Sequence, residues 1–256
     1  MKFTFGIITN GGGFIENIMN SIAMQIPSEN YEIIIIGKCN IETKKDINFT
    51  IIEFDETKKN MWITRKKNLV TEHAKYDNIV FLHDYICLEP NWYQGFLDFV
   101  DIWDVCITPI KNLDNTRFRD LTIFPFYEDL PHGNDCHLSH FTKKDLFRQV
   151  PGMNKLECLM PYNSSKEMFD YLNEWQYISG AYWVAKKHVM KKYPLNETLV
   201  WLQGEDLEWS ERIKKEYNIS FNINSEVKLL KQKDVIFVPF SSNTINLLKI
   251  NQNVKN

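Results

Sequence analysis

The 256-residue sequence lacks any stretch rich in proline, glycine or serine that would divide it, and it contains only 9 prolines and 10 glycines. We therefore expect a single domain over residues 1–256, a length typical of one large α/β domain. A formal net charge of −3 is too close to balance for a general nucleic-acid-binding protein, so no nucleic-acid partner is predicted. The hydrophobic fraction of 44% is sufficient for a packed core.

Long apolar runs and paired cysteines are also missing. No apolar run reaches the ~18 residues of a membrane-spanning helix, and the N-terminal segment becomes glycine-rich at Gly11, too early for a signal peptide. The sequence predicts a cytoplasmic protein, bacterial or viral in composition, with peripheral membrane association left open. An odd number of scattered cysteines favours reduced thiols over a disulfide framework; they are Cys39, Cys87, Cys106, Cys136 and Cys158.

Short apolar runs alternate with amphipathic segments over the first 110 residues. This alternation predicts a mainly parallel central sheet flanked by helices, which is an α/β fold. The predicted strands are 3–8, 31–36, 49–54, the run from Asn78 that ends in His83 and Asp84, and 104–110. The predicted helices are 14–26, 61–74 and one that opens near Pro90.

The second half is less regular. Residues 111–175 are aromatic, charged and aperiodic, which indicates functional loops. Residues 176–185 are typical of a strand or a bend with Gly180 at its centre. A helix is predicted to open at Gly204 and to end near Tyr217, and the tail from Ser220 offers one or two short strands, one of them at 234–240.

Polar residues follow three of the predicted strands, at Thr9-Asn10, Gly37-Lys38 and His83-Asp84. Ligands of open parallel sheets collect at the carboxyl ends of the strands, because loops and helix N-termini converge there. A polar residue after a strand is also a common turn former. The coincidence of three such ends nevertheless predicts a site at this edge.

The glycine triplet Gly11–Gly13 follows the first strand and matches no phosphate-binding fingerprint. The G-x-x-x-x-G-K-[ST] pattern is absent from it, and a dinucleotide fingerprint would need glycine or alanine where Glu16 stands. Two interpretations remain open, a flexible strand-to-helix turn and a loop that contacts a nucleotide.

His83 and Asp84 have the chemistry of a hard-cation site. A carboxylate binds Mg²⁺ or Mn²⁺ while substrate phosphates supply further oxygens, and imidazole suits Mn²⁺ better than Mg²⁺. The alternative is a capping aspartate beside a packed histidine.

Glu205 and Asp206 stand together at a predicted helix start. They would complement the helix dipole there. Crowding of like charges would also keep one of them basic enough for a general base.

A histidine-rich loop invites a zinc interpretation, but its spacing matches no standard zinc pattern. A solvated loop is the favoured interpretation for this group, which comprises His132, Cys136, His137 and His140.

Four segments, in this order and spacing, resemble the GT-A-fold glycosyltransferases, and in particular their family-2-like inverting members. "FTFGIITNG" is similar to their first, nucleotide-facing strand. "TRKKNLVTEHAKYDNIVFLHDYICLEPNW" resembles the segment with a basic-Asn pair, the fourth strand and the DxD metal motif. "QYISGAYWVAKK" is similar to the acceptor-side glycine segment, and "GEDLEWSERI" to the ED motif of the catalytic base.

The resemblance departs from the family pattern at three points. The first and third aspartates of DxD fall on His83 and Tyr85, which leaves Asp84 as the motif's carboxylate. The acidic residue expected after the second strand is replaced around Gly37-Lys38. Members often use a late histidine as a further metal ligand, and no histidine follows His188.

The resemblance implies a GT-A (Rossmann-like) fold, with residues 1–110 binding the nucleotide sugar and 111–256 binding the acceptor and supplying the base. It implies metal-assisted transfer, with inversion, from a UDP- or GDP-type sugar to a hydroxyl on a glycan or other acceptor. Asp206, beside Glu205, would be the base, and Asp84 with His83 would hold Mn²⁺ or Mg²⁺. The acceptor side would comprise Ser179, Gly180 and Trp209, and the donor would also contact Thr9, Asn10, Gly11, Lys38, Arg65, Lys67 and Asn68.

Two rival functions remain. A sugar nucleotidyltransferase would share the sheet, but it needs an arginine in its glycine-rich loop, and "NGGGFIENI" has none. A catalytically degenerate sugar-binding or scaffold protein is favoured by the weakened DxD motif.

Overall fold

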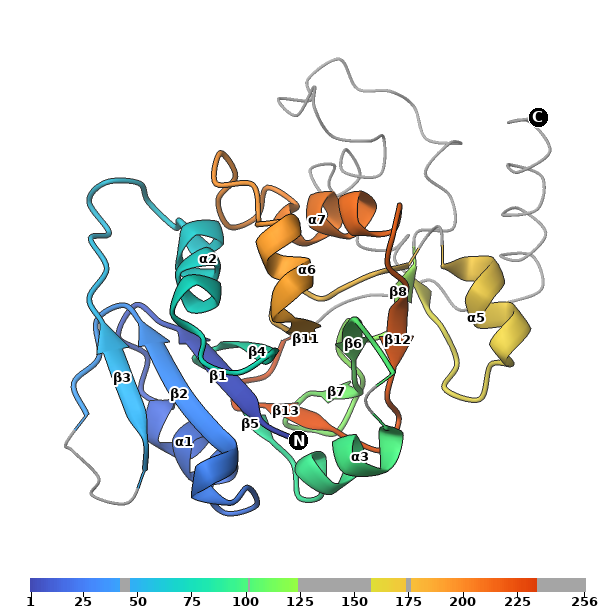
Figure 1. Cartoon of the computed structure of the whole chain (residues 1–256), viewed down its shortest axis with the longest axis horizontal. Coiled ribbons are helices and arrows are strands. Elements are labelled where there is room, and N and C mark those ends of the chain that lie inside the picture. Colours follow the sequence, from blue (N-terminus) through green and yellow to red (C-terminus); the bar gives the residue numbers. More distant parts are fainter. Residues whose placement is uncertain (42–46, 101, 124–157, 174–175, 234–256) are drawn as a thin grey trace.

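A seven-stranded central sheet organises the computed structural model, which describes residues 1–41, 47–100, 102–123, 158–173 and 176–233 (Figure 1). Its strand order is β12-β6-β11-β4-β1-β2-β3. The strands are β1 (Phe3–Ile8), β2 (Tyr31–Ile36), β3 (Phe49–Ile52), β4 (Asn78–His83), β6 (Val105–Ile107), β11 (Tyr182–Lys186) and β12 (Ile219–Phe221).

All of these strands run in one direction except β11. β11 lies antiparallel between β4 and β6, so its first residue, Tyr182, sits opposite Leu82 near the carboxyl end of β4. The turn that precedes β11 is thereby brought to the same edge as the ends of β1, β2 and β4. This edge is where the sequence predicts a site.

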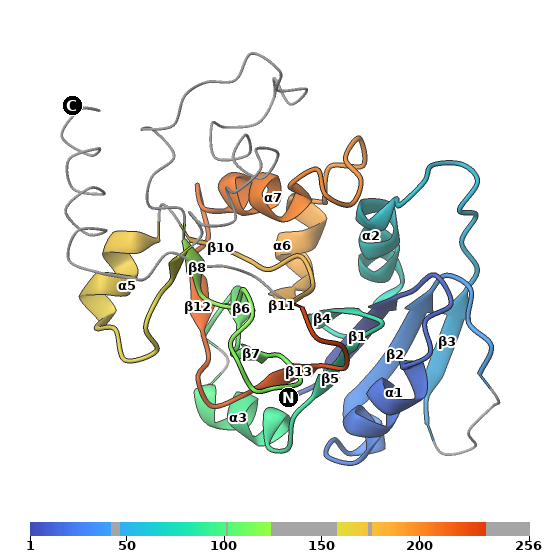
Figure 2. The same ribbon diagram turned by 180° about the vertical axis from the view of Figure 1, so that it is seen from behind.

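Helices cover both faces of the sheet. One face packs against α1 (Ile15–Ala23) and α3 (Trp92–Phe99), in a core that joins Phe3 and Phe5 to Ile18 and Trp92. The other face packs against α2 (Ile63–His73), α6 (Lys187–Lys192) and α7 (Glu205–Ile213). The two layers are visible from opposite sides in Figures 1 and 2. The protein is therefore a three-layer α/β fold.

Two small sheets complete the described structure. In one, β13 (Val227–Leu229) lies between β5 (Ile86–Leu88) and β7 (Ile110–Lys111). In the other, β8 (Thr122–Ile123) lies between β10 (Gln176–Tyr177) and β9 (Cys158–Leu159). The remaining helices are a 3₁₀ turn at Ser28–Asn30 and α5 (Lys166–Leu172).

The predicted elements of the first half are confirmed, and β1 and β2 have the predicted bounds. Two predictions need correction. Residues 104–110 form β6 and β7 rather than one strand, because Pro109 has no N–H to donate to a ladder. Residues 176–185 form β10 and β11, separated by a turn at Ser179–Gly180. The strand predicted at 234–240 lies outside the described residues.

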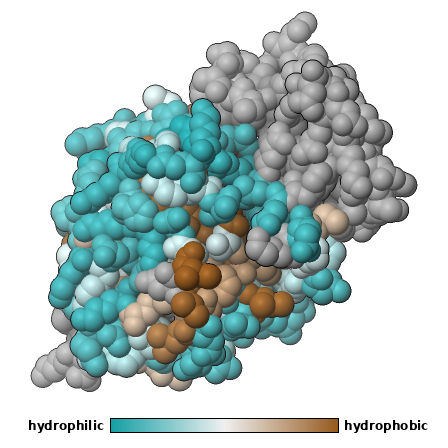
Figure 3. Space-filling view, turned by 45° about the vertical axis from the view of Figure 1, so that its right-hand side comes forward, coloured by the Kyte–Doolittle hydropathy of each residue, from teal (hydrophilic) through white to brown (hydrophobic). Residues whose placement is uncertain are grey.

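Within the described residues, no helix has the length and apolar character to cross a bilayer. The surface view in Figure 3 shows one face on which hydrophobic side chains gather in a patch among hydrophilic ones. Large hydrophobic side chains that the structure exposes include Val100, Ile102, Trp201 and Leu202.

Candidate active site

The ends of β1, β2 and β4 meet, as the sequence predicts. In the sheet register Ile8 lies opposite both Ile36 and His83, so the residues that follow these strands are neighbours. The Thr9 hydroxyl donates to Asp84 Oδ2 at 2.7 Å and accepts from the backbone N–H groups of Gly11 and Gly12 at 3.0 and 3.1 Å. Thr9 thus connects the glycine loop to Asp84.

The glycine loop approaches Asp84 so closely that Gly12 has no room for a side chain. A Cβ built on Gly12 would lie 2.4 Å from Asp84 Oδ2, which is closer than real Cβ contacts. Glycine at position 12 therefore does more than turn the chain, because it lets the backbone approach the Asp84 carboxylate.

A pocket of about 390 Å³ opens beside these residues; we call it the Asp84 pocket. Three lysines line it, and among the described residues Asp84 is its only acidic one. Its lining comprises Ile8, Thr9, Asn10, Met61, Ile63, Lys66, His83, Asp84, Tyr85, Trp201, Lys231 and Lys233.

A second hollow of about 710 Å³ is lined by the glycine loop; we call it the loop pocket. Asn10 lines both hollows, and Gly11 and Lys38 line the loop pocket. Glu53, just after β3, adds a carboxylate there. Two adjacent compartments that share Asn10 suit a ligand with two chemically different parts.

Lys231 and Lys233 reach the Asp84 pocket through the small sheet of β13. β13 pairs with β5, and the next backbone N–H, that of Leu230, donates to the Tyr85 carbonyl at 2.7 Å. The Lys231 and Lys233 ammonium groups lie 3.9 and 4.0 Å from the centre of the Tyr85 ring. Burial and the nearby Lys231 lower the pKa of Lys233 to about 8.

The His83 imidazole is held in its neutral form. Burial, followed by the charges of Lys67, Lys233 and Lys231, places its pKa well below the ordinary value. Its Nε2 is buried and has no hydrogen-bond partner among the described residues. Such a nitrogen is available to accept a bond from a ligand.

The predicted metal ligands do not form a complete divalent-cation site by themselves. Within the described part of the chain no group of three or more His, Cys, Asp or Glu side chains is arranged to hold an ion. Asp84 Oδ2 is already engaged by Thr9, and the third DxD position is the phenol Tyr85. Substrate phosphates can complete a donor set of one carboxylate and one imidazole. The ammonium groups of Lys231 and Lys233 line the same pocket, however, and they repel a cation, so this set does not fit a resident Mn²⁺ or Mg²⁺.

The two carboxylates of the ED segment are buried at the start of α7. Glu205 is 5% and Asp206 4% exposed. The Gly180 N–H donates to Asp206 Oδ2 at 2.9 Å, and the Leu207 N–H donates to Asp206 Oδ1 at 3.0 Å. A Cβ on Gly180 would lie 2.7 Å from Glu205 Oε1 and 3.0 Å from Asp206 Oδ2. Glycine at 180 is therefore required for this approach.

The Lys67 side chain lies beside Glu205 and Asp206. Its ammonium group donates to the Gly180 carbonyl at 2.8 Å and lies 3.7 Å from Glu205 Oε1. Burial, together with the neighbouring Asp206, raises the pKa of Glu205 to about 7, and Lys67 opposes the rise. Burial likewise lowers the pKa of Lys67. The Glu205 carboxyl therefore retains a proton at higher pH than an exposed glutamate does.

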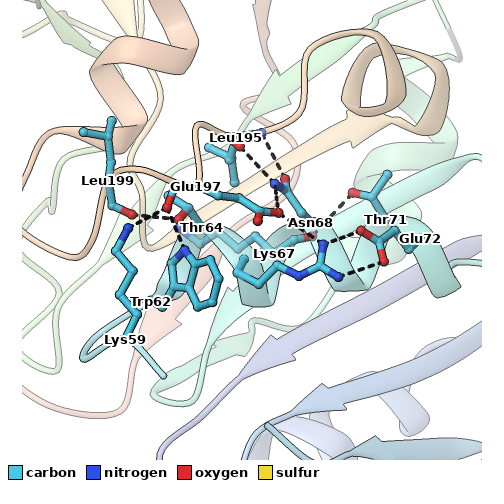
Figure 4. A network of polar contacts seen from close by, with 11 residues as sticks. Lys59, Trp62, Thr64, Lys67, Asn68, Thr71, Glu72, Leu195, Glu197 and Leu199 are labelled. Carbon is cyan, nitrogen blue, oxygen red and sulfur yellow. Dashed lines mark hydrogen bonds and ion pairs between the residues drawn. The ribbon is translucent and has the colours of Figure 1, made fainter. Parts of the chain in front are cut away.

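The basic residues of α2 diverge, which corrects two predicted placements. Arg65 pairs with Glu72 at 2.5 Å and Glu197 at 3.1 Å, and Asn68 donates to the Leu195 carbonyl and Glu197 (Figure 4). Neither lines the Asp84 pocket. Successive helix residues point about 100° apart, so neighbours in sequence face different surroundings. Arg65 and Asn68 tie α2 to the 195–199 loop instead.

Lys67 also differs from its predicted place, since it faces Glu205 and not the Asp84 pocket. Lys66, which lies between Arg65 and Lys67 in the sequence, is the basic residue of α2 that reaches the ends of the strands. Its ammonium group donates to the Thr9 carbonyl at 2.7 Å and to the Asn10 side chain, and it pairs with Glu56.

Of the three residues predicted on the acceptor side, two lie beside Asp206 and one lies in the core. Ser179 and Gly180 form the turn that contacts Asp206. Trp209 is fully buried in the core and its indole N–H donates to the Tyr193 carbonyl at 2.7 Å, which corrects the prediction that it faces an acceptor. The loop with His132, Cys136, His137 and His140 lies outside the described residues.

Sequence reasoning missed Lys66, Lys231 and Lys233 as pocket residues. Lys66 was hidden between two other basic residues. The alternation of lysine in "KQK" at 231–233 was the available signal, because residues two apart in an extended chain lie on one side.

No protein-family model and no curated protein sequence matches the chain. Solved structures do. GalNAc-T7, crystallised with UDP, GalNAc and Mn²⁺, has 11% identity and a TM-score of 0.58, with 97% of this chain and 48% of that chain covered. TarS 1–349 of S. aureus has 14% identity and a TM-score of 0.49, with 100% and 65% covered. The same TarS fragment in complex with UDP-GlcNAc has 14% identity and a TM-score of 0.48, with 94% and 59% covered.

The chain spans about half the length of GalNAc-T7 and 65% of the TarS fragment. At 11% identity the similarity to GalNAc-T7 shows the fold alone. The mainly parallel seven-stranded sheet with helices on both faces has the GT-A fold of glycosyltransferases.

Proposed function

We propose that the protein is a glycosyltransferase that moves a sugar from a nucleotide-diphosphate sugar to an acceptor hydroxyl, with inversion. One observation carries the proposal: the lysine-lined Asp84 pocket and the buried carboxylate pair lie on either side of one turn. The His83 N–H donates to the Ala181 carbonyl at 3.1 Å, and Gly180, next to Ala181, donates to Asp206. The turn at Gly180–Ala181 thereby contacts the proposed anion site through His83 and the proposed base through Asp206.

The donor would lie across the two pockets. Its nucleoside would occupy the loop pocket, near Gly11, Lys38 and Glu53, and its diphosphate the Asp84 pocket. GalNAc-T7, which shares the fold, was crystallised with UDP. A UDP- or GDP-type sugar is the proposed donor, bound mainly by residues 1–110, and a glycan or other hydroxyl compound is the proposed acceptor, bound by the second half.

The proposed reaction is a single displacement. The carboxylate pair accepts the proton of the acceptor hydroxyl, and the oxygen forms a bond to the anomeric carbon. The bond from that carbon to the diphosphate breaks on the opposite face, and its electron pair leaves with the nucleoside diphosphate. One displacement inverts the anomeric centre. No step is assigned to a metal ion, because the His83 and Asp84 donor set does not fit one.

The base is assigned to Asp206, as the resemblance implies. Two backbone N–H groups hold its carboxylate in a defined orientation, as a positioned base requires. Glu205, with its raised pKa and its contact to Lys67, sets the charge around Asp206. Exchange of these two roles is the alternative assignment, and conservative substitution of each residue distinguishes them.

Thermal denaturation with a panel of nucleotide sugars tests the donor class, because a ligand that binds only the folded protein raises the melting temperature. Transfer or slow hydrolysis of the stabilising nucleotide sugar would support the proposal. Release of pyrophosphate from a nucleoside triphosphate and a sugar phosphate would instead indicate the nucleotidyltransferase. Binding without turnover towards any acceptor would indicate a degenerate sugar-binding protein.

A further inference from the structure

We propose that Lys231 and Lys233 hold the diphosphate of the donor in place of a metal ion. The inference rests on the proposed function for the identity of the ligand, but it concerns a different property, the source of the positive charge. GT-A sites with an intact DxD motif bind a cation through carboxylates. Here the third motif position is an aromatic ring, and two lysine side chains gather on it.

Tyr85 explains how the two lysines are held. The face of an aromatic ring attracts a cation, and both ammonium groups lie about 4 Å from the Tyr85 ring centre, at 3.9 and 4.0 Å. The Lys233 ammonium group also donates to the Tyr85 hydroxyl at 2.5 Å. The phenol that replaces a metal-binding aspartate therefore positions cations belonging to the chain itself.

The charges at this place are unbalanced. Among the described residues neither Lys231 nor Lys233 forms an ion pair with a carboxylate, whereas Lys66 pairs with Glu56. In the part of the chain that the structure describes, Asp84 is the only acidic residue that lines the pocket, and it accepts a hydrogen bond from Thr9. Like charges on one ring repel each other, and a bound anion offsets that repulsion. A diphosphate supplies both the charge and several acceptor oxygens.

Contacts of β13 and of the residues after it hold both lysines at the pocket. β13 is anchored to β5 and β7, and Gln232, between the lysines, donates to Asp114. The Lys233 N–H donates to the Asn112 side chain at 3.0 Å. Backbone and intervening side chain are therefore fixed on neighbouring elements, while both ammonium groups point to Tyr85. Such an arrangement is prepared for a ligand before the ligand arrives.

Calorimetric binding of UDP, GDP and inorganic pyrophosphate to the full chain, in excess EDTA and again with Mn²⁺, tests the inference. We expect at least one of these diphosphates to bind in EDTA, with an affinity that changes less than about threefold when Mn²⁺ is added. Lys231→Ala and Lys233→Ala should each weaken that binding about tenfold, the scale of one lost charge-assisted hydrogen bond. The double variant should weaken it further.

Lys228→Ala is the matched control, because Lys228 lies on the same segment but donates to Asn115 and does not line the pocket. It should bind as the unaltered protein does. Circular dichroism melting of each variant separates lost binding from lost folding. Lys233→Arg keeps the positive charge, so it should retain more diphosphate binding than Lys233→Ala does.

Binding that requires Mn²⁺ would overturn the inference, as would a double variant that binds normally or a protein that binds no diphosphate in either condition. Metal-free, lysine-dependent binding without any sugar transfer would contradict the proposed function and leave the inference standing. If EDTA abolished both sugar transfer and diphosphate binding, the inference would be overturned and the proposed function would stand.

Discussion

The Asp84 pocket and the Glu205–Asp206 pair lie at the same edge of the sheet, yet they surround their carboxylates differently. Asp84 faces an open pocket and is outnumbered by lysines. Glu205 and Asp206 are buried with one buried lysine beside them, and Asp206 accepts from two backbone N–H groups. The difference indicates two tasks, because excess positive charge in an open pocket suits an anion, whereas burial makes a carboxylate more basic.

Replacement of Asp206 by Asn should separate the two regions most strongly. Loss of a positioned base lowers turnover by ~10²-fold or more, whereas nucleotide binding at the other region should be nearly unchanged. Asparagine keeps the size of the side chain and an oxygen for the Gly180 N–H. Initial rates and nucleotide-sugar affinity measure the effect.

Glu205→Gln is the control for Asp206→Asn. A larger loss of turnover in the glutamine variant would move the base to Glu205. If both variants kept full turnover, the proposed displacement mechanism would be refuted.

A methyl group at Gly180 should disturb only the carboxylate region. In Gly180→Ala the new Cβ would lie within 3.0 Å of both carboxylates, so at least one must move. We expect turnover to fall by about tenfold, since small displacements of a base are costly. Diphosphate binding should hold, and a variant that loses both equally would show that the two regions are not separable.

The pH dependence should follow the carboxylate pair. Since the pKa of Glu205 is raised to about 7 from an ordinary 4.5, kcat/KM should rise with pH through about 7, because Glu205 loses its proton and adds negative charge beside Asp206. The free energy of unfolding should change with pH in the opposite direction to kcat/KM. The pKa of Glu205 is higher in the folded than in the unfolded protein, so the protonated carboxyl stabilises the fold at low pH. This contribution is lost as the pH rises from about 4.5 to about 7.

Glu205→Gln should flatten that fall in the melting temperature between about pH 5 and pH 8, because glutamine does not titrate. A profile identical in variant and unaltered protein would show that another group titrates.

Arg65→Ala should have the smallest effect of these variants. It should leave nucleotide binding and turnover unchanged. Its side chain is 29% exposed and pairs with Glu72 and Glu197, so we expect a loss of stability of about 0.5 kcal/mol, as for other partly exposed ion pairs. Chemical denaturation measures this loss, with Glu72→Ala as the control. A strong fall in nucleotide affinity would restore Arg65 to the donor site, as the sequence first suggested.

Much of the fold was predictable because its signals are local. Apolar runs bounded by glycine, asparagine or histidine define β1, β2 and β4, and these match the structure closely. The convergence of Thr9, Gly37 and Asp84 follows from parallel strands alone. The antiparallel insertion of β11 was not predictable, because pairing with β4 and β6 depends on segments about 100 and about 80 residues earlier in the chain.

The roles within "RKKN" at 65–68 show why site residues are harder to predict than strands. The four residues are adjacent, but helical rotation sends Arg65 and Asn68 to Glu197, Lys66 to Thr9 and Lys67 to Glu205. Trp209 entered the core for the same reason, since its place on α7 faces the sheet. Residue type indicates what chemistry is available, whereas the facing surface decides which chemistry is used.

The sequence by itself determined the alternation of strands and helices, the edge at which polar residues gather and the two acidic segments, because each depends on neighbours within a few positions. Only the tertiary structure decided which charges meet. It placed Lys231 and Lys233, almost 150 residues after Tyr85, on the Tyr85 ring, and it raised the pKa of Glu205 by burial. Burial and long-range contact are properties of the folded chain, and local sequence does not contain them.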